Sequence, residues 1–509
     1  MQFPLNRPAG PAVILAAPSR RLVTARLLLS LALPLAAVTA AAQGLPDLGD
    51  ASSATITEAQ ERTIGNRIMR DLRNDPAYVD DAEITDYIRG LGERLMSAAD
   101  APRRDVTYFV VQDDQINAFA LVGGHIGVHS ALFTLTQSES ELAGVLAHEI
   151  AHITQKHQAR AIAGAGRSQW ASLAALAVAV LASRGSSSQA GQVTEAAITA
   201  AGALQIQAQL DYTREHEREA DRVGLTLLER AGFDPRGMGA FFERMLRANR
   251  LSEFKGAPSY LRTHPLTTER IADMQDRNQQ PVFRMARADG YEYRLIRAKL
   301  RAATGSPSEA VTYFRAALAD KTVVRPREEV YGLALALRRA RDFEAAWSTL
   351  EPLRQGDSHP AFERLAADLL ADQGRTDEAL GVYRAAIKTH PGARALVHGY
   401  LGLQMDKGRA REVLADLDER LRRSSDDPRL YELQARAYEA TGRPIPQHRA
   451  QAEALYRRGN LGAAVQQLEW AVRLKGTDFY ETSIAESRLR ELRALLEIER
   501  AAEKALKIT

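Results

Sequence analysis

The chain has 509 residues, of which 45% are hydrophobic and 26% are charged, and it contains no cysteine. This length predicts more than one domain, and the apolar content excludes a chain that is disordered throughout. Without cysteine, disulfide bonds and thiolate metal sites are excluded, so any metal must bind through histidine, aspartate or glutamate. The net charge is +3, from 67 basic and 64 acidic side chains.

The N-terminal segment accounts for that charge. Residues 1–26 carry four arginines and no acidic residue, and the apolar run Leu27–Val38 and Ala40-Ala41-Ala42 follow them. A basic start, a short apolar run and an A-x-A site predict a secretory signal peptide, here residues 1–42. Its removal takes away four of the 67 basic residues and none of the 64 acidic ones, which leaves a net charge of −1. We therefore expect no nucleic-acid partner.

Between residues 43 and 284 the sequence predicts a domain with both helices and strands. In chain order, the expected elements are a helical stretch over 55–98, a strand over 106–112, a hairpin over 116–128, and helices over 139–157 and 192–230. The helices are predicted from apolar residues at helical spacing, and the strand from its β-branched and aromatic content. Gly123-Gly124 marks the turn of the hairpin.

An apolar segment, residues 170–182, lies between two of these helices and is too short to cross a bilayer. Two interpretations stay open. The segment is either a buried helix of the domain, or a lid or hairpin over a cleft that makes peripheral contact with a membrane.

After about residue 284 the strand signals end and a repeat begins. Each frame has a first residue that is usually glycine, a small apolar residue five positions later, and a large apolar residue four positions after that. The frames begin at Gly305, Arg341, Gly374, Gly408 and Gly459. The first four begin 36, 33 and 34 residues apart, and the fifth begins 51 residues after the fourth. A period near 34 predicts an all-α, tetratricopeptide-like solenoid over 285–509, which offers a surface for binding other chains.

The strongest signal for chemistry is the sequence from His148 to His152, which reads HEIAH. Side chains four residues apart lie on one face of a helix, so the two imidazoles can hold one zinc ion. Glu149 lies beside them and can act as general base toward an attacking water. A catalytic zinc site needs a third protein ligand as well.

Two candidates for that ligand follow in the sequence. His157 is the nearer one, but Gln155 and Gln158 break the HExxHxxGxxH spacing, and we expect His157 at the surface. Glu217 and Asp221 are one helical turn apart, and we expect the first to bind the metal and the second to accept a ring N–H from a ligating histidine. The neighbouring Glu215, His216 and Glu219 are expected to form an ordinary charged helix face.

HExxH followed by a glutamate in an ExxxD helix resembles the M48 family of zinc metallopeptidases, over roughly residues 55–280. The resemblance implies a mainly α, gluzincin-like α+β domain with a small β-sheet. It also implies one zinc ion per chain, bound by His148, His152 and Glu217, with Glu149 as the catalytic base. Asp221, as the expected partner of His148, is counted with Glu149 among the catalytic residues.

Two further segments match the family. Asn117 and Ala118 resemble its edge strand and are implied to bind substrate in extended form, although Asn117 could equally be a turn residue. His264 matches a histidine that is either a fourth zinc ligand holding the enzyme latent or a group that stabilises the oxyanion; a helix-capping role stays open. Arg270 is a match or a surface salt-bridge residue.

The layout of signal peptide, M48-like domain and repeat array resembles that of periplasmic members of the family. It implies a periplasmic endopeptidase, associated with the outer membrane, that degrades misfolded or stalled outer-membrane proteins and assists β-barrel assembly. The implied partner of the repeats is the outer-membrane barrel-assembly machinery. The alternative is a periplasmic chaperone or scaffold that acts through the repeats and has a latent zinc site. The lack of cysteine departs from relatives with a disulfide in the array.

Overall fold

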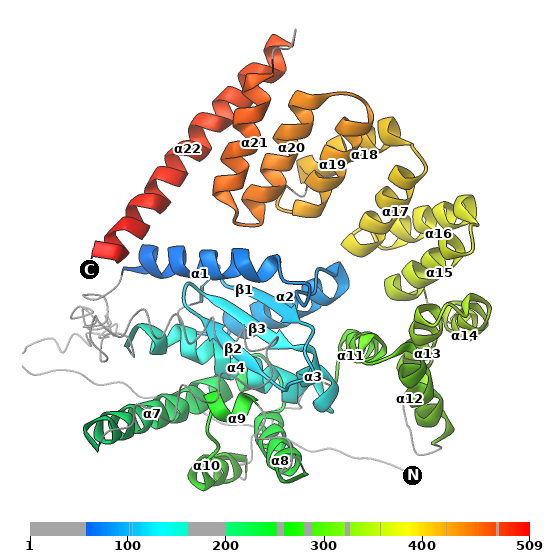
Figure 1. Cartoon of the computed structure of the whole chain (residues 1–509). Helices are drawn as coiled ribbons and strands as arrows, with labels where there is room; N and C mark the ends of the chain where they lie inside the picture. Colours follow the sequence, from blue (N-terminus) through cyan, green and yellow to red (C-terminus); the bar gives the residue numbers. More distant parts are fainter. Residues whose placement is uncertain are drawn as a thin grey trace, which may run out of the picture. The chain divides into compact units, whose positions relative to one another are not determined.

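The computed structural model of the chain describes residues 57–508, except for 101, 104, 161–199, 252–258, 279–287, 321–325, 357, 424 and 475–477. Figure 1 shows the arrangement of its helices and strands. The predicted signal peptide and the apolar segment 170–182 lie outside the described residues, so both remain predictions. Among the helices that the structure describes, none combines the length and apolar character that a transmembrane span requires.

Two amphipathic helices, α1 (Glu58–Arg73) and α2 (Ala82–Ser97), open the described chain. A capping box between Thr57 and Gln60 starts α1, and the side chain of Asp81 caps the first turn of α2. Their apolar faces are buried, as helical spacing predicts. The predicted helical stretch is therefore correct but is divided into two helices.

A three-stranded sheet follows, with β1 (Thr107–Val111), β2 (Ala118–Leu121) and β3 (His125–His129). The central strand is β3, which pairs in parallel with β1 and antiparallel with β2. Gly123 and Gly124 have φ values of 84° and 86°, a left-handed conformation that glycine adopts at little cost. The predicted strand and hairpin are thus present, and β2 is an edge strand within the described part of the chain.

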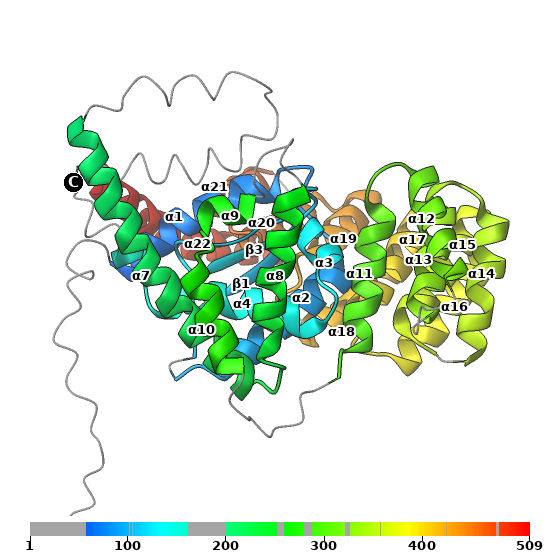
Figure 2. The same ribbon diagram turned by 90° about the horizontal axis from the view of Figure 1, so that it is seen from below.

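Six helices of the described residues complete the first domain. They are α3 (Ser130–Leu135), α4 (Glu139–Thr154), α7 (Ala200–Arg230), α8 (Arg236–Leu251), α9 (Ser259–Thr263) and α10 (Thr268–Asn278). Helix α4 packs against α2, α7, α8 and β2. Helix α10 packs on α8 (Figure 2). A Cβ added at Gly224 of α7 would lie 3.1 Å from the backbone nitrogen of His148, so this glycine permits the close approach of α7 to α4.

Beyond residue 290, the described part of the chain forms twelve helices, and successive ones pack against each other. They are α11 (Tyr291–Ala303), α12 (Pro307–Ala319), α13 (Pro326–Arg339), α14 (Phe343–Gly356), α15 (Pro360–Asp372), α16 (Thr376–Thr389), α17 (Arg394–Asp406), α18 (Ala410–Arg423), α19 (Pro428–Ala440), α20 (Pro444–Arg457), α21 (Leu461–Arg473) and α22 (Phe479–Ile508). The predicted fold class is confirmed: a mainly α domain with a small sheet, then an all-α helical array.

The repeat frames correspond to turns in the array. The first residue of all five frames has a positive φ, between 65° and 78°. A sixth residue of this kind, Gly442 (φ 70°), lies 34 residues after Gly408 and 17 before Gly459. The irregular spacing of 51 residues is therefore one full period plus one half-period, because left-handed turns occur both within and between helix pairs at this end.

Helix α11 belongs to both hydrophobic cores. Tyr293, Ile296 and Leu300 are buried in the core of the first domain, whereas Leu295 and Ala298 are buried in the first core of the array. The predicted boundary at 284/285 lies just before this shared helix.

Candidate metal centre

Helix α4 places His148 and His152 on one face. The side chain of Ser138 caps its first turn, and apolar neighbours bury nearly all of its length. The two imidazole rings are 4.7 Å apart, and their Nε2 atoms are 3.1 Å apart. The helical spacing of HExxH therefore produces the predicted pair of nitrogen ligands.

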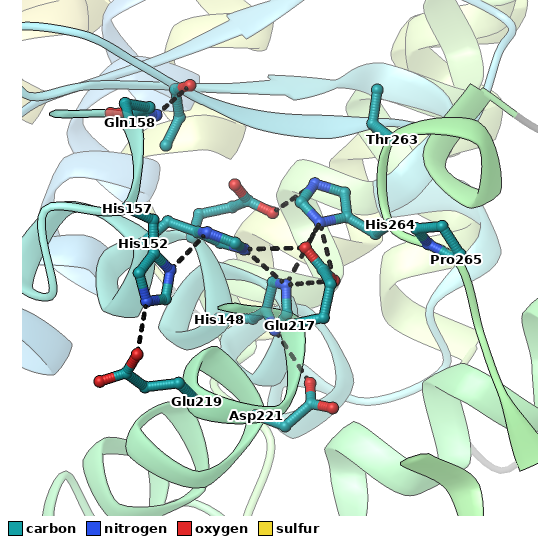
Figure 3. A network of polar contacts seen from close by, with 12 residues as sticks. His148, His152, His157, Gln158, Glu217, Glu219, Asp221, Thr263, His264 and Pro265 are labelled. Carbon is teal, nitrogen blue, oxygen red and sulfur yellow. Dashed lines mark hydrogen bonds and ion pairs between the residues drawn. The ribbon is translucent and has the colours of Figure 1, made fainter. Parts of the chain in front are cut away.

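Two more ligand candidates approach this pair from other elements. Glu217 of α7 places Oε2 3.3 Å from His148 Nε2 and Oε1 3.3 Å from His152 Nε2. His264, which directly follows α9, places Nδ1 3.3 Å from His148 Nε2 and 3.0 Å from Glu217 Oε1 (Figure 3). One ligand atom from each of the four residues lies within 4.8 Å of the others.

This donor set fits a metal cation. Three imidazole nitrogens and a carboxylate are the ligand types of zinc sites in proteins. The Nε2 atoms of His148 and His152 both face the carboxylate of Glu217, as ligands of one cation would. The structure thus brings together all four residues for which the sequence predicts metal binding.

Asp221 and Arg270 contact the ligand residues outside the cluster of ligand atoms. Asp221 Oδ1 is 3.0 Å from His148 Nδ1, so it can accept the ring N–H and leave Nε2 to face the other ligands. Arg270 donates to Asp221 from Nε and Nη2, at 2.6 and 2.8 Å, and its Nη1 is 3.0 Å from Glu217 Oε2. Arg270 is fully buried and not a surface residue, a role that its isolated position in the sequence does not reveal.

Glu149 lies at the same cluster. Only 1% of the residue is exposed, and its Oε1 makes no hydrogen bond within the described part of the chain, although His264 Nε2 lies 3.4 Å away. A buried carboxylate oxygen in this position has an acceptor site available for a water or a substrate N–H.

The electrostatics of the centre favour an ionised glutamate beside a protonated imidazole. Burial raises the pKa of Glu217, but the imidazoles of His264 and His148 outweigh it and hold that pKa well below its usual range. Burial lowers the pKa of His148, but Glu217 and Asp221 raise it to about 10. A cation at Nε2 competes with that proton, so we expect metal binding to release protons.

The predicted substrate-binding residues lie on the edge strand with different orientations. The backbone oxygen of Asn117 accepts from His129 N, so its backbone faces β3. Because hydrogen-bonded and non-hydrogen-bonded pairs alternate along an antiparallel ladder, the backbone groups of Ala118 and Ala120 point away from β3. Gln158 Nε2 donates to Ala120 O at 2.7 Å, which agrees with this orientation. Ala118 therefore has its backbone groups directed to this edge of the sheet, although the residue is fully buried, whereas Asn117 has its backbone groups turned toward β3.

The expectation for His157 is wrong. The residue is 3% exposed, and its Nδ1 lies 2.9 Å from His152 Nδ1. Its Nε2 lies 3.1 Å from Glu219 Oε2, and its ring stacks on His216 at 4.3 Å. Burial lowers the pKa of His157 to about 3, with His152 and His216 acting in the same direction, so the ring is neutral.

The expectation of an ordinary charged helix face beside Glu217 is wrong for His216, which is buried against His157. Glu219 is partly buried beside His157, and Glu215 is exposed as expected. Gln155 and Lys156 form a turn that separates α4 from the helical residues 157–160, and Lys156 has a φ of 52°. Helical spacing therefore does not apply to His157.

Known proteins match most of the chain. The model of peptidase family M48 matches residues 83–278. The "Beta-barrel assembly-enhancing protease" of Escherichia coli (strain K12) is 33% identical over 469 residues, which cover 90% of this chain and 92% of the relative. A "Putative beta-barrel assembly-enhancing protease" of Vibrio cholerae is 39% identical over 62% of this chain and 64% of the relative. The "Metalloprotease YcaL" of Escherichia coli (strain K12) is 27% identical over 44% of this chain and 82% of the relative.

The family that the HExxH and ExxxD motifs indicated is confirmed by these matches, and so is the expectation of a metalloendopeptidase. The chain belongs to peptidase family M48.

Proposed function

We propose that the chain is a periplasmic zinc endopeptidase, exported by residues 1–42, that degrades misfolded or stalled outer-membrane proteins and assists β-barrel assembly. The observation that carries the catalytic part is the convergence of His148, His152 and Glu217 with Glu149 beside them. The similarity to proteases that are named for β-barrel assembly supports the choice of substrate.

The roles of the side chains follow from their positions. His148, His152 and Glu217 would hold zinc, which supplies a Lewis acid at the substrate carbonyl. Glu149 would take a proton from the attacking water and pass it to the leaving amine, because it is buried at the cluster and has an open acceptor. Asp221 would hold His148 in the tautomer whose Nε2 is free to bind metal.

His264 supports a latent form of the enzyme. Its Nδ1 lies among the ligand atoms and contacts Glu217 and His148. This position among the ligand atoms favours the fourth-ligand role over the oxyanion role. A histidine bound there would compete with the substrate carbonyl for the metal, which would keep the enzyme latent. Movement of His264 would then open the site.

An unfolded chain would pair with β2 at Ala118 by addition of a strand, once the groups that cover this fully buried residue have moved. The helical array of residues 285–509 would dock the barrel-assembly machinery, since stacked helix pairs offer an extended binding surface.

Cleavage of an unfolded outer-membrane β-barrel protein by wild type and Glu149→Gln tests the mechanism. The glutamine preserves size but cannot accept the proton, so we expect cleavage to fall by a factor of about 100 or more, with zinc content unchanged. Equal cleavage by the two proteins would contradict the assignment. His264→Ala is expected to raise cleavage above the wild-type level, and lower activity would instead indicate the oxyanion role.

The arrangement of His264 also favours a second candidate, a periplasmic chaperone or scaffold that acts through the array while the zinc site stays closed. In cells that lack the wild-type gene, full rescue of outer-membrane assembly by Glu149→Gln would favour this function. Loss of rescue would favour the peptidase.

A further inference from the structure

The two histidines of α4 have different surroundings behind the ligand cluster. His148 Nδ1 faces the carboxylate of Asp221 directly, and Arg270 holds that carboxylate. His152 Nδ1 faces a second imidazole, that of His157, at 2.9 Å. Beyond it, Glu219 lies 3.1 Å from His157 Nε2 and 2.9 Å from Arg160 Nη1. Each histidine therefore connects to a carboxylate that is paired with an arginine, but His152 does so through an inserted ring.

Only one arrangement of ring protons satisfies these contacts when His152 binds a metal. Its Nε2 needs a free lone pair, so the proton of the neutral ring is on Nδ1. His157 Nδ1 must then accept that proton's hydrogen bond, which places the proton of His157 on Nε2, where Glu219 accepts it. Glu219 thus fixes the tautomer of His157, and His157 fixes the tautomer of His152.

The local fold is built to return His157 to this position. Helix α4 ends at Thr154, and Lys156 adopts a φ of 52°, a left-handed conformation that is uncommon for residues other than glycine. The turn brings a residue five positions after His152 back to its ring, and the ring of His216 stacks on the other side of His157 at an interplanar angle of 8°.

We propose that His157 is a positioning residue of the metal centre, which orients His152 and increases its affinity for the metal through the chain of hydrogen bonds to Glu219. This inference rests on the proposed zinc site. Loss of partners of this kind typically weakens metal binding about 10–100-fold.

The test compares His157→Asn with His157→Leu. The two substituted side chains have nearly the same shape and both lose the stacking on His216, but only asparagine offers an oxygen that can accept from His152 Nδ1. Zinc affinity is measured by competition with a chelating indicator. We expect His157→Leu to weaken zinc binding about 10–100-fold and His157→Asn to stay within about 3-fold of wild type.

Two readouts separate positioning from general damage. The metal-stripped forms of both variants should melt at the same temperature. With Co²⁺ in place of zinc, the visible spectrum of His157→Asn should match wild type, and that of His157→Leu should shift. Equal losses of affinity in both variants, or a loss in neither, would overturn the proposal.

Glu219→Leu provides a second variant that leaves the imidazoles of His152 and His157 unchanged. The side chain of Glu219 is partly exposed, so the protein should tolerate its replacement. This variant should weaken zinc binding in the same direction, and wild-type affinity in both leucine variants would refute the chain of hydrogen bonds. If the wild type itself binds no zinc, the proposed function fails. If the wild type binds zinc and the leucine variants bind it equally well, the function stands and this inference fails.

Discussion

Arg270 helps to keep the buried carboxylate of Asp221 ionised. Burial raises the pKa of Asp221, but its hydrogen bonds from Arg270 and His148 outweigh this and hold the pKa below its usual range. Removal of the guanidinium in Arg270→Gln should therefore raise the pKa of Asp221, and the carboxylate will gain a proton at higher pH. We expect acid-induced release of zinc to move up by about one pH unit.

Zinc content after dialysis at a series of pH values measures this shift. Arg262→Gln removes the same charge from an exposed position nearby and should leave the release curve unchanged. Arg270→Lys keeps the charge but loses the double hydrogen bond, so its release curve should lie between those of wild type and Arg270→Gln. A release curve of Arg270→Gln that coincides with wild type would contradict the role of Arg270.

The site residues show where sequence reasoning reached and where it ended. His148, His152 and Glu217 could be predicted because ligand residues at helical spacing keep that spacing when the helix forms. His157 could not, since its place depends on the left-handed turn at Lys156. The sequence does not decide between a buried and a surface position for Arg270, because nothing near it in the sequence indicates its contacts with Glu217 and Asp221.

At the left-handed turns of the array, Arg341 stands where the equivalent turns have glycine. Its φ of 65° matches those of the glycines at equivalent turns, but an L-residue with a side chain is strained there by roughly 1–2 kcal/mol. Because glycine loses more backbone entropy on folding, Arg341→Gly should raise the free energy of unfolding by only about 0.5–1 kcal/mol. Denaturant unfolding measures the change.

The reciprocal substitution, Gly374→Arg, serves as the matched control. No heavy atom lies within 4 Å of a Cβ added at Gly374, so the added side chain meets open space and only the backbone is strained. It should lower the free energy of unfolding by a similar amount. The same sign of change in both variants would show that these turns are not governed by backbone conformation.

Element prediction succeeded where a pattern was local. The glycine spacing located the turns of the array, and Gly123-Gly124 located the hairpin, because each turn depends on the conformation of one or two residues. The turn at Gly442 lies outside the predicted frames, because each frame requires two apolar residues at fixed distances after its first residue. The position five residues after Gly442 holds Gln447, which is not apolar.

At the scale of the whole molecule, arginines of the array pair with acidic residues at the start of α2. Arg364, Arg394 and Arg458 lie 3.1, 2.7 and 2.8 Å from Asp81, Asp86 and Asp80, respectively. These pairs span from 283 to 378 residues along the chain. Neither hydropathy nor spacing can predict such partners, because each charge alone looks like an ordinary solvated residue.

Asp81 is the best placed of these acidic residues to link the two regions. It caps α2, and its carboxylate also accepts from Lys299 of α11 at 2.8 Å and from Arg364 of α15. Burial raises its pKa, but Lys299 and Arg364 outweigh this and hold it well below the usual value of 3.8. A depressed pKa stabilises the fold above the unfolded-state pKa, and this stability is lost as the pH falls below it.

Asp81→Asn keeps an oxygen for the helix cap but removes the charge, so it isolates this contribution. We expect the variant to lose about 1–3 kcal/mol of unfolding free energy at neutral pH and to be less sensitive than wild type to acid below about pH 4. Asp100→Asn alters an exposed pair with Arg230 and should change little. Denaturant unfolding at neutral pH and near pH 3 distinguishes these outcomes. If Asp81→Asn and wild type lose the same stability on acidification, then Asp81 does not hold the array and the peptidase domain together through its charge.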